Sequence, residues 1–443
     1  MKSVKRYFFA MMMVSSMLTM SCEKEQIEEV IPESNSMSVG QYSVSSFTAN
    51  LTGTFDGVDK TDLVMGKRGV LYGIKSDKTE SAFKEWQKGN DNPECIIVDK
   101  ADFQGASMKC AVNGLVANTE YSYCLFLQKR DGSREISSVS SFKTQLFAPE
   151  MKNLDVKGVE CFVAFAEGKV LINEKDASYC ELGVLASQET NANINNSMVF
   201  KQKGVYNSTV TARLNGLESD KHYYCRLYVK YPGANGQSDY VYGESVIIRT
   251  KAFEEVAVDL GLSVYWASYN VGASAPEEFG NYYSWGELAP KTNYTWDTFK
   301  WKGNMKYCTD TLSTNLTSLK MMELADDAAN YNWGGNWQIA TDAVFGELHD
   351  NCDIDFYAEI NGVKGKRFTS RINGNSIFIP YSGFLRYNSV PNGVGNMFLF
   401  FLRDLYFCQA TYGFYIGWGL TKQNHYDYTP WDGVSVRPVY PKE

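Results

Sequence analysis

The chain has 443 residues, of which 44% are hydrophobic and 21% charged, and these proportions are those of a globular protein rather than a disordered one. Its 43 basic and 51 acidic residues give a net charge of −8, which argues against a nucleic-acid binder because phosphate neutralisation needs basic surface. The length exceeds what a single hydrophobic core usually supports, so several domains are expected.

The first 21 residues have the pattern of an export signal. Lys2, Lys5 and Arg6 form a basic start, and an uncharged, largely apolar run follows over 7–20. As a helix this run is shorter than the roughly 30 Å hydrocarbon core of a membrane, so it is typical of a signal peptide and not of a membrane span. We therefore predict that 1–21 is a signal peptide, with an ordinary secretory peptide cleaved nearby as the alternative.

The end of this segment carries a candidate lipid anchor. Ser21-Cys22 resembles the lipobox of bacterial lipoproteins, although Thr19 stands where an apolar residue is usual. The resemblance implies that Cys22 is acylated, becomes the mature N-terminus and inserts its acyl chains into membrane lipid. Cys22 is thus the predicted anchor residue.

Residues 22–37 are polar and acidic and are interpreted as a flexible tether. The acidic cluster just after Cys22 also resembles the export signal that sends Bacteroidetes lipoproteins to the outer face of the outer membrane. A location at the outer membrane, facing outward, is therefore expected. A solvated linker without such a signal is the alternative.

Residues 38–147 and 148–252 carry one pattern twice. The run from Gly114 to Tyr121 aligns with the run from Gly216 to Tyr223, and each leads into alternating apolar residues, as in a strand with one buried face. Short alternating strands separated by turn residues predict a β-sandwich. The repeat is therefore interpreted as one sandwich domain that occurs twice.

The repeated Gly-Leu-x-x-x-Thr-x-Tyr run resembles fibronectin type III domains, with Lys221 in place of Thr119 in the second copy. The resemblance implies that Tyr121 and Tyr223 bury their rings and direct their hydroxyls to backbone groups upstream. Both sandwiches are expected to serve as spacers that hold another domain away from the membrane.

One stretch of the first repeat, 78–88, does not fit a strand. Ala82, Phe83 and Trp86 stand at helical spacing, which predicts a short helix in a loop. Trp86 is expected to pack against its own domain and not to bind a ligand.

Ten cysteines occur, and nine remain after Cys22. The odd number and the absence of any Cys-x-x-Cys pattern favour buried thiols over a disulfide framework or a zinc site. A bridge within the second repeat, among Cys161, Cys180 and Cys225, is left open.

The last segment, 255–443, is rich in aromatic residues and carries a recognisable series of sequence blocks. They include Val258–Ala267, Asn332–Trp337, Gly374–Pro380 and Ser435–Val439. In this order the blocks resemble the Fibrobacter succinogenes major paralogous domain of Bacteroidetes lipoproteins. The resemblance implies an α+β fold similar to C-type lectins and to formylglycine-generating enzymes. The expected fold class is thus multidomain and mainly β, with two immunoglobulin- or fibronectin-like sandwiches before a C-type-lectin-like domain.

The residues of this domain predict several elements directly. Alternation over 261–266 and 434–439 predicts two strands, whose pairing would bring the ends of the domain together. Thr341 has the character of an N-cap, followed by a helix with Phe345 and Leu348 on one face. The apolar run 398–401 is interpreted as a buried strand, with a partner-binding edge as the alternative.

Nothing in the chain indicates catalysis. The acid pair Asp326-Asp327 is interpreted as a helix cap and a solvated face, and the known hydrolase and phosphate-loop motifs do not occur. The related formylglycine enzymes use two late cysteines, whereas only Cys408 stands in that region. We therefore expect no enzymatic activity, no cofactor and no metal.

Binding is the expected function, because sugars are held by aromatic faces with acids and amides nearby. An aromatic cluster between the last strands supplies the candidate ligand-binding residues Trp418, His425, Tyr428, Trp431 and Asp432. The alternative is that these rings fill a loop-rich core. The chain is accordingly predicted to be a lipid-anchored adhesin or glycan-binding protein, and otherwise a structural or assembly subunit of a pilus or envelope complex that binds protein.

Overall fold

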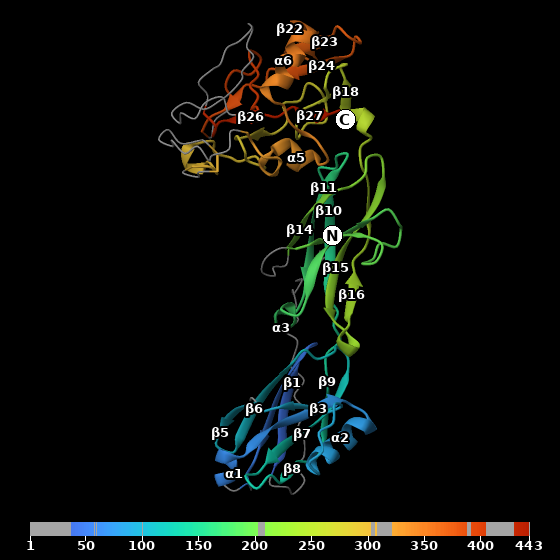
Figure 1. The fold of residues 1–443 in the computed structure, drawn as a ribbon, viewed down its shortest axis with the longest axis vertical. Helices are drawn as coiled ribbons and strands as arrows, with labels where there is room; N and C mark the ends of the chain where they lie inside the picture. Colours follow the sequence, from blue (N-terminus) through green and yellow to red (C-terminus); the bar gives the residue numbers. More distant parts are fainter. Residues whose placement is uncertain are drawn as a thin grey trace, which may run out of the picture. The chain divides into compact units, whose positions relative to one another are not determined.

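The computed structural model describes residues 37–56, 58, 60–99, 101–202, 209–302, 306–307, 321–387, 391–404 and 429–442. These residues form a mainly β protein with several antiparallel sheets, as the sequence predicts (Figure 1). The chain divides into two compact units. The first comprises residues up to Ala148 with 173–179 and 232–238, and the second comprises the remainder.

The first unit is built mainly from two antiparallel sheets that share one core. One sheet has the order β1-β2-β6-β5, with β1 Ser38–Val44, β2 Thr48–Thr54, β6 Ser107–Asn113 and β5 Asp102–Gln104. The other has the order β4-β3-β7-β8, with β9 also pairing with β7: β4 Ile96–Val98, β3 Lys67–Ile74, β7 Glu120–Gln128, β8 Arg134–Ile136 and β9 Ser140–Lys143. Helix α1 (Lys60–Met65) precedes β3. The short α3 (Glu174–Ala177) and η1 (Ala234–Gly236) also belong to this unit.

The helix predicted in the first repeat is α2 (Asp77–Gln87). The Ser76 hydroxyl caps it by accepting a hydrogen bond from Thr79 N at 3.1 Å. Ala82, Phe83 and Trp86 are buried in a small cluster that also contains Cys124 and Phe126 of β7. Trp86 therefore packs within its own domain, as predicted.

The second repeat again forms two sheets, and it lies mostly in the second unit. One sheet has the order β10-β11-β14, with β10 Glu150–Lys157, β11 Val163–Leu171 and β14 Thr209–Asn215. The other has the order β13-β12-β15-β16, with β17 also pairing with β15: β13 Met198–Lys201, β12 Glu181–Ser187, β15 His222–Pro232, β16 Ser238–Tyr242 and β17 Val246–Arg249.

Both repeats contain the predicted tyrosine hydrogen bond. Tyr121 and Tyr223 are buried, and their hydroxyls accept hydrogen bonds from Val116 N and Glu218 N, each at 2.9 Å. Each bond spans five residues and fixes the turn into the following strand. The prediction made for the two tyrosines is confirmed.

Thr119 of the first repeat corresponds to Lys221 of the second, and the corner is formed in both copies. At both positions the backbone N–H is the group used, and it donates to the hydroxyl of Thr144 or Thr250 at 2.9 Å. The Thr119 hydroxyl also donates to the Ala117 carbonyl at 2.9 Å, whereas the backbone bond is common to both copies and is kept when the side chain changes.

The described part of the C-terminal domain contains three small antiparallel sheets. The first has the order β18-β19-β27-β21, with β18 Ala257–Asp259, β19 Val264–Ala267, β27 Pro438–Pro441 and β21 Gln338–Ile339. The second is β20-β26-β25 and the third β22-β23-β24, with β20 Tyr282–Tyr283, β26 Gly433–Ser435, β25 Phe384–Leu385, β22 Cys352–Ile360, β23 Val363–Ser370 and β24 Ser376–Pro380. The helical segments are α4 Phe253–Val256, η2 Trp296–Thr298, η3 Leu324–Asp326, α5 Ala328–Trp333 and α6 Asp342–Asn351.

Two local predictions for this domain are confirmed. Strand β19 pairs antiparallel with β27, with Trp266 opposite Val439, so the ends of the domain meet. Helix α6 begins after Thr341, whose hydroxyl accepts from Val344 N at 3.4 Å, and it buries Phe345 and Leu348. In Figure 1, α6 lies with β22, β23 and β24.

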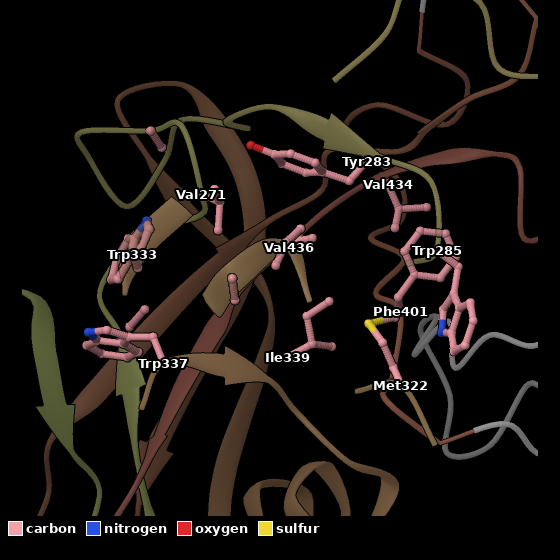
Figure 2. Packing of buried hydrophobic residues seen from close by; sticks show 14 of the residues in the cluster. Val271, Tyr283, Trp285, Met322, Trp333, Trp337, Ile339, Phe401, Val434 and Val436 are labelled. Carbon is pink, nitrogen blue, oxygen red and sulfur yellow. The ribbon is translucent and has the colours of Figure 1, made fainter. Parts of the chain in front are cut away.

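The run 398–401 is buried on both faces. Phe398 and Phe400 belong to the cluster around Trp266, whereas Leu399 and Phe401 belong to the cluster around Trp285, part of which Figure 2 shows. The segment therefore lies between the two cores of the domain, as a buried strand would, although it forms isolated bridges and no continuous ladder. It is not a free partner-binding edge.

The described cysteines form no disulfide with one another. Cys95, Cys110, Cys124, Cys161, Cys225 and Cys352 are buried, and Cys180 is half-buried. Burial raises the pKa of the Cys225 thiol to about 12, so the neutral thiol acts there as a small apolar side chain. The prediction of buried thiols is thus confirmed for six of the seven described cysteines.

Candidate functional site

Four of the predicted site residues, Cys22, Trp418, His425 and Tyr428, lie outside the described residues. In the part of the chain that the structure describes, no helix is both long enough and apolar enough to span a membrane. Trp431 and Asp432 are described, and they lie directly before β26.

Trp431 is half-buried, packs against the core cluster around Trp285, and contacts the segment that contains η2. Its ring stands 5.1 Å from that of Trp296 at an interplanar angle of 68°, and 6.3 Å from that of Phe299. A reciprocal capping box between Thr295 and Thr298 sets the conformation of η2 and so the position of Trp296. The two half-buried tryptophans therefore form one edge-to-face pair.

Asp432 is fully buried below this pair. Its two carboxylate oxygens accept from Arg386 Nε at 2.8 Å and Arg386 Nη2 at 2.7 Å, and Oδ2 also accepts from Thr429 N at 3.0 Å. The carboxylate that the sequence suggested as a ligand contact is therefore engaged by the protein itself. Its role in the structure is to hold the turn that carries Trp431.

Tyr387 adds an exposed ring next to the same segment. Its backbone exchanges two hydrogen bonds with Tyr294, at 3.1 and 2.9 Å, and its side chain is 63% exposed. Its φ of +60° is uncommon for a residue with a side chain and costs free energy. We call Trp296, Tyr387 and Trp431 the aromatic surface.

Charged groups border the aromatic surface. Lys302 forms an exposed ion pair with Asp297, and its Nζ lies 6.0 Å from the centre of the Trp296 ring. Lys291 is less exposed and donates to Glu287 at 2.9 Å and to the Thr298 carbonyl at 3.1 Å. The rim thus offers both donors and acceptors beside apolar ring faces.

Of the two acids in the pair Asp326-Asp327, one has the predicted role and the other does not. Asp327 caps α5 as predicted, because its Oδ1 accepts from Ala329 N at 2.8 Å and Asn330 N at 3.2 Å. Asp326, expected on a solvated face, is instead buried and accepts from Lys300 Nζ at 2.9 Å. Burial raises the pKa of Asp327 to about 6.

We searched the described residues for side chains that could bind a metal ion together. Among the described residues, no group of three or more His, Cys, Asp or Glu side chains is placed to hold a metal ion. The aromatic surface instead combines apolar ring faces with charged groups at its rim, so it is suited to bind an organic ligand that has both apolar and polar surface.

Three residues of the site were not singled out in the sequence: Trp296, Arg386 and Tyr387. The dense aromatic run Tyr294–Trp301 was a usable signal for Trp296. No local pattern marks Arg386 or Tyr387, because their roles depend on partners far away in the chain.

Neither a scan against protein-family models nor a search of curated proteins finds a match for this chain. Its function is therefore inferred from its own residues and their geometry.

Proposed function

We propose that this chain is a lipid-anchored surface protein whose C-terminal domain binds carbohydrate through the aromatic surface. Cys22 anchors it in the outer membrane, and two fibronectin type III-like sandwiches precede a C-type-lectin-like head. The sheet orders and the two tyrosine corners support the sandwich assignment. The β19–β27 pairing of the domain ends supports the assignment of the head.

One observation carries the proposal. Five tryptophans of the domain are buried in its cores: Trp266, Trp285, Trp301, Trp333 and Trp337. Trp296 and Trp431 are the described exceptions: they pack against the outside of the core, stay half-exposed, and contact each other although they are far apart in the sequence. Rings that gather at the surface from distant segments, on a rigid support, are typical of a binding site.

The chemistry of this surface fits a pyranose. The C–H face of a sugar ring packs on an aromatic face, and the sugar hydroxyls need donors and acceptors at the edge of that face. Asp297 and Lys302 supply such groups beside Trp296. A bound sugar would thus satisfy both its apolar and its polar surface.

Binding without catalysis is favoured by the state of the buried acids. Asp326, Asp327 and Asp432 each accept hydrogen bonds from cationic side chains or backbone N–H groups. Acids engaged in this way serve as structural anchors and are poorly placed to transfer protons to a ligand.

The proposal is tested on a glycan array with the full chain and two variants. Tyr387→Ala removes an exposed ring without opening the core, and Trp431→Ala removes the half-buried anchor. Each is expected to weaken binding by about 1–3 kcal/mol, the scale of a lost aromatic contact. The matched control is Tyr357→Ala, because Tyr357 is 84% exposed on β22.

The result would count against the proposal if both variants stay folded and bind every glycan as the parent chain does. Loss of binding by the Tyr357 control alone would place the site on β22 instead.

A protein-binding assembly subunit is the second candidate. Ile96 and Ile97 are 49% and 46% exposed on β4, which is an edge strand of its sheet. An exposed apolar edge favours pairing with another chain. Self-association that is measured by sedimentation and abolished by Ile97→Lys would support this candidate.

A further inference from the structure

Phe162, just before β11 of the second repeat, packs into the C-terminal domain. Its ring lies 6.3 Å from that of Phe253 and 6.1 Å from that of Tyr440. The preceding residue, Cys161, is fully buried in the same core cluster as Trp333 and Trp337 of the C-terminal domain. The core of that domain is thus completed by residues of the second repeat.

Two glycines make room for Phe162. A Cβ at Gly335 would lie 2.6 Å from Phe162 Cδ2, and a Cβ at Gly334 would lie 2.9 Å from the Phe162 carbonyl oxygen. Both glycines also have positive φ, +71° and +53° in chain order, which other residues rarely adopt. Gly334 and Gly335 are therefore shaped for this contact as well as for the turn after α5.

Arg213 of β14 secures the end of α5. Its Nε donates to the Tyr331 carbonyl at 2.8 Å and its Nη2 to the Asn330 carbonyl at 3.1 Å. Its guanidinium also lies 4.9 Å from the centre of the Tyr331 ring. The Asn330 carbonyl also accepts from Gly334 N at 2.9 Å, so Arg213 adds a second donor there and a donor to the Tyr331 carbonyl in the last turn of α5. A cation at this end of a helix is favourable.

A buried polar group joins the same two parts. Lys251 Nζ donates to Glu160 Oε1 at 2.9 Å and to the Tyr269 hydroxyl at 2.7 Å. Glu160 is 8% exposed and Tyr269 is 6% exposed. Lys251 and Glu160 both belong to the second repeat, so only the bond from Lys251 to the Tyr269 hydroxyl crosses to the C-terminal domain. Separation would break that bond, which favours the joined state.

The first repeat offers an internal comparison. Phe47 occupies the position of Phe162, since Leu115 N donates to the Phe47 carbonyl at 2.9 Å and Leu217 N donates to the Phe162 carbonyl at 3.2 Å. Phe47 is fully buried in the first unit, where its ring lies 5.0 Å from that of Phe147. Its ring also lies 5.8 Å from that of Tyr179, so Phe47 packs within the first unit, whereas Phe162 packs against the C-terminal domain within the second.

We infer that the second repeat is a structural part of the head and not a spacer. The second repeat and the C-terminal domain fold and unfold as one cooperative body, so the smallest stable binding unit contains both. This inference goes beyond the proposed function, because it holds whatever the head binds. It leaves the first repeat and the tether as the spacer.

The test is hydrogen–deuterium exchange on the full chain, read by mass spectrometry. Phe162→Ala is expected to speed exchange of α5 and β21 amides at least about tenfold, because the loss of docking is transmitted to the head. Exchange in β3 and β7 should not change. The matched control Phe47→Ala should have the opposite pattern, with faster exchange in the first unit only.

A milder variant guards against general misfolding. Arg213→Met keeps the aliphatic stem but removes the two hydrogen bonds to α5, and it should speed exchange at the end of α5 and in β14 together. The inference is overturned if both variants loosen only the second repeat while α5 and β21 exchange at the parent rate. Separate calorimetric transitions for the second repeat and the C-terminal domain would overturn it as well.

Discussion

Removing the guanidinium below the aromatic surface should destabilise the second unit more than removing its carboxylate partner. Arg386→Met leaves the fully buried Asp432 carboxylate with the Thr429 N–H at 3.0 Å but without its two bonds to Arg386. An uncompensated buried charge of this kind costs about 3–5 kcal/mol. Asp432→Asn leaves Arg386, whose side chain is 34% exposed and can regain water, so its cost should be about 1–2 kcal/mol.

Urea denaturation of the full chain, followed through the second-unit transition, measures both values. The double variant should be more stable than the sum of the two single losses predicts, since neither charge is then left alone. The same proteins are assayed for binding, because the buried pair holds the turn that carries Trp431. Binding should therefore be weaker for the variant that loses more stability.

Two results would refute this reasoning. Equal costs for the two single variants would show that the buried carboxylate is not the vulnerable partner. A large loss of binding by Asp432→Asn at unchanged stability would show that Asp432 contacts the ligand directly, and would return it to the list of ligand-binding residues.

Three further outcomes are expected. Tyr121→Phe and Tyr223→Phe should each cost about 1 kcal/mol in urea denaturation, because each leaves a backbone N–H without its acceptor; no change in either would contradict the corner assignment. The pKa of Asp327 is raised from 3.8 to about 6, so the folded state takes up a proton at higher pH than the unfolded state. Lowering the pH from 7 to 4 should therefore stabilise the parent chain over Asp327→Asn by up to about 3 kcal/mol, and parallel pH profiles would argue against it. Cys22→Ser should move the protein from the detergent phase to the aqueous phase in a partition assay, and retention in detergent would disprove the anchor.

The elements that the sequence predicted correctly depend on near neighbours. The helix with Trp86 follows from apolar spacing within 78–88, and α6 follows from the cap at Thr341 with Phe345 one turn later. The tyrosine corners span five residues each. The local backbone conformation determines which nearby groups form hydrogen bonds and on which face of a helix or strand each side chain lies. A short stretch of sequence is therefore enough to predict these features.

The candidate site and the role of the second repeat were decided by tertiary structure. Whether Trp431 is half-buried depends on Trp296, and whether Asp432 faces solvent depends on Arg386, 46 residues away. Cys161 and Phe162 follow the alternating pattern of their own repeat, yet they complete the core of another domain. Exposure is a property of all the surfaces that surround a side chain, and most of those surfaces come from distant segments. Composition and periodicity therefore identify which residues are able to form a core or a site, while packing determines which of the two they form.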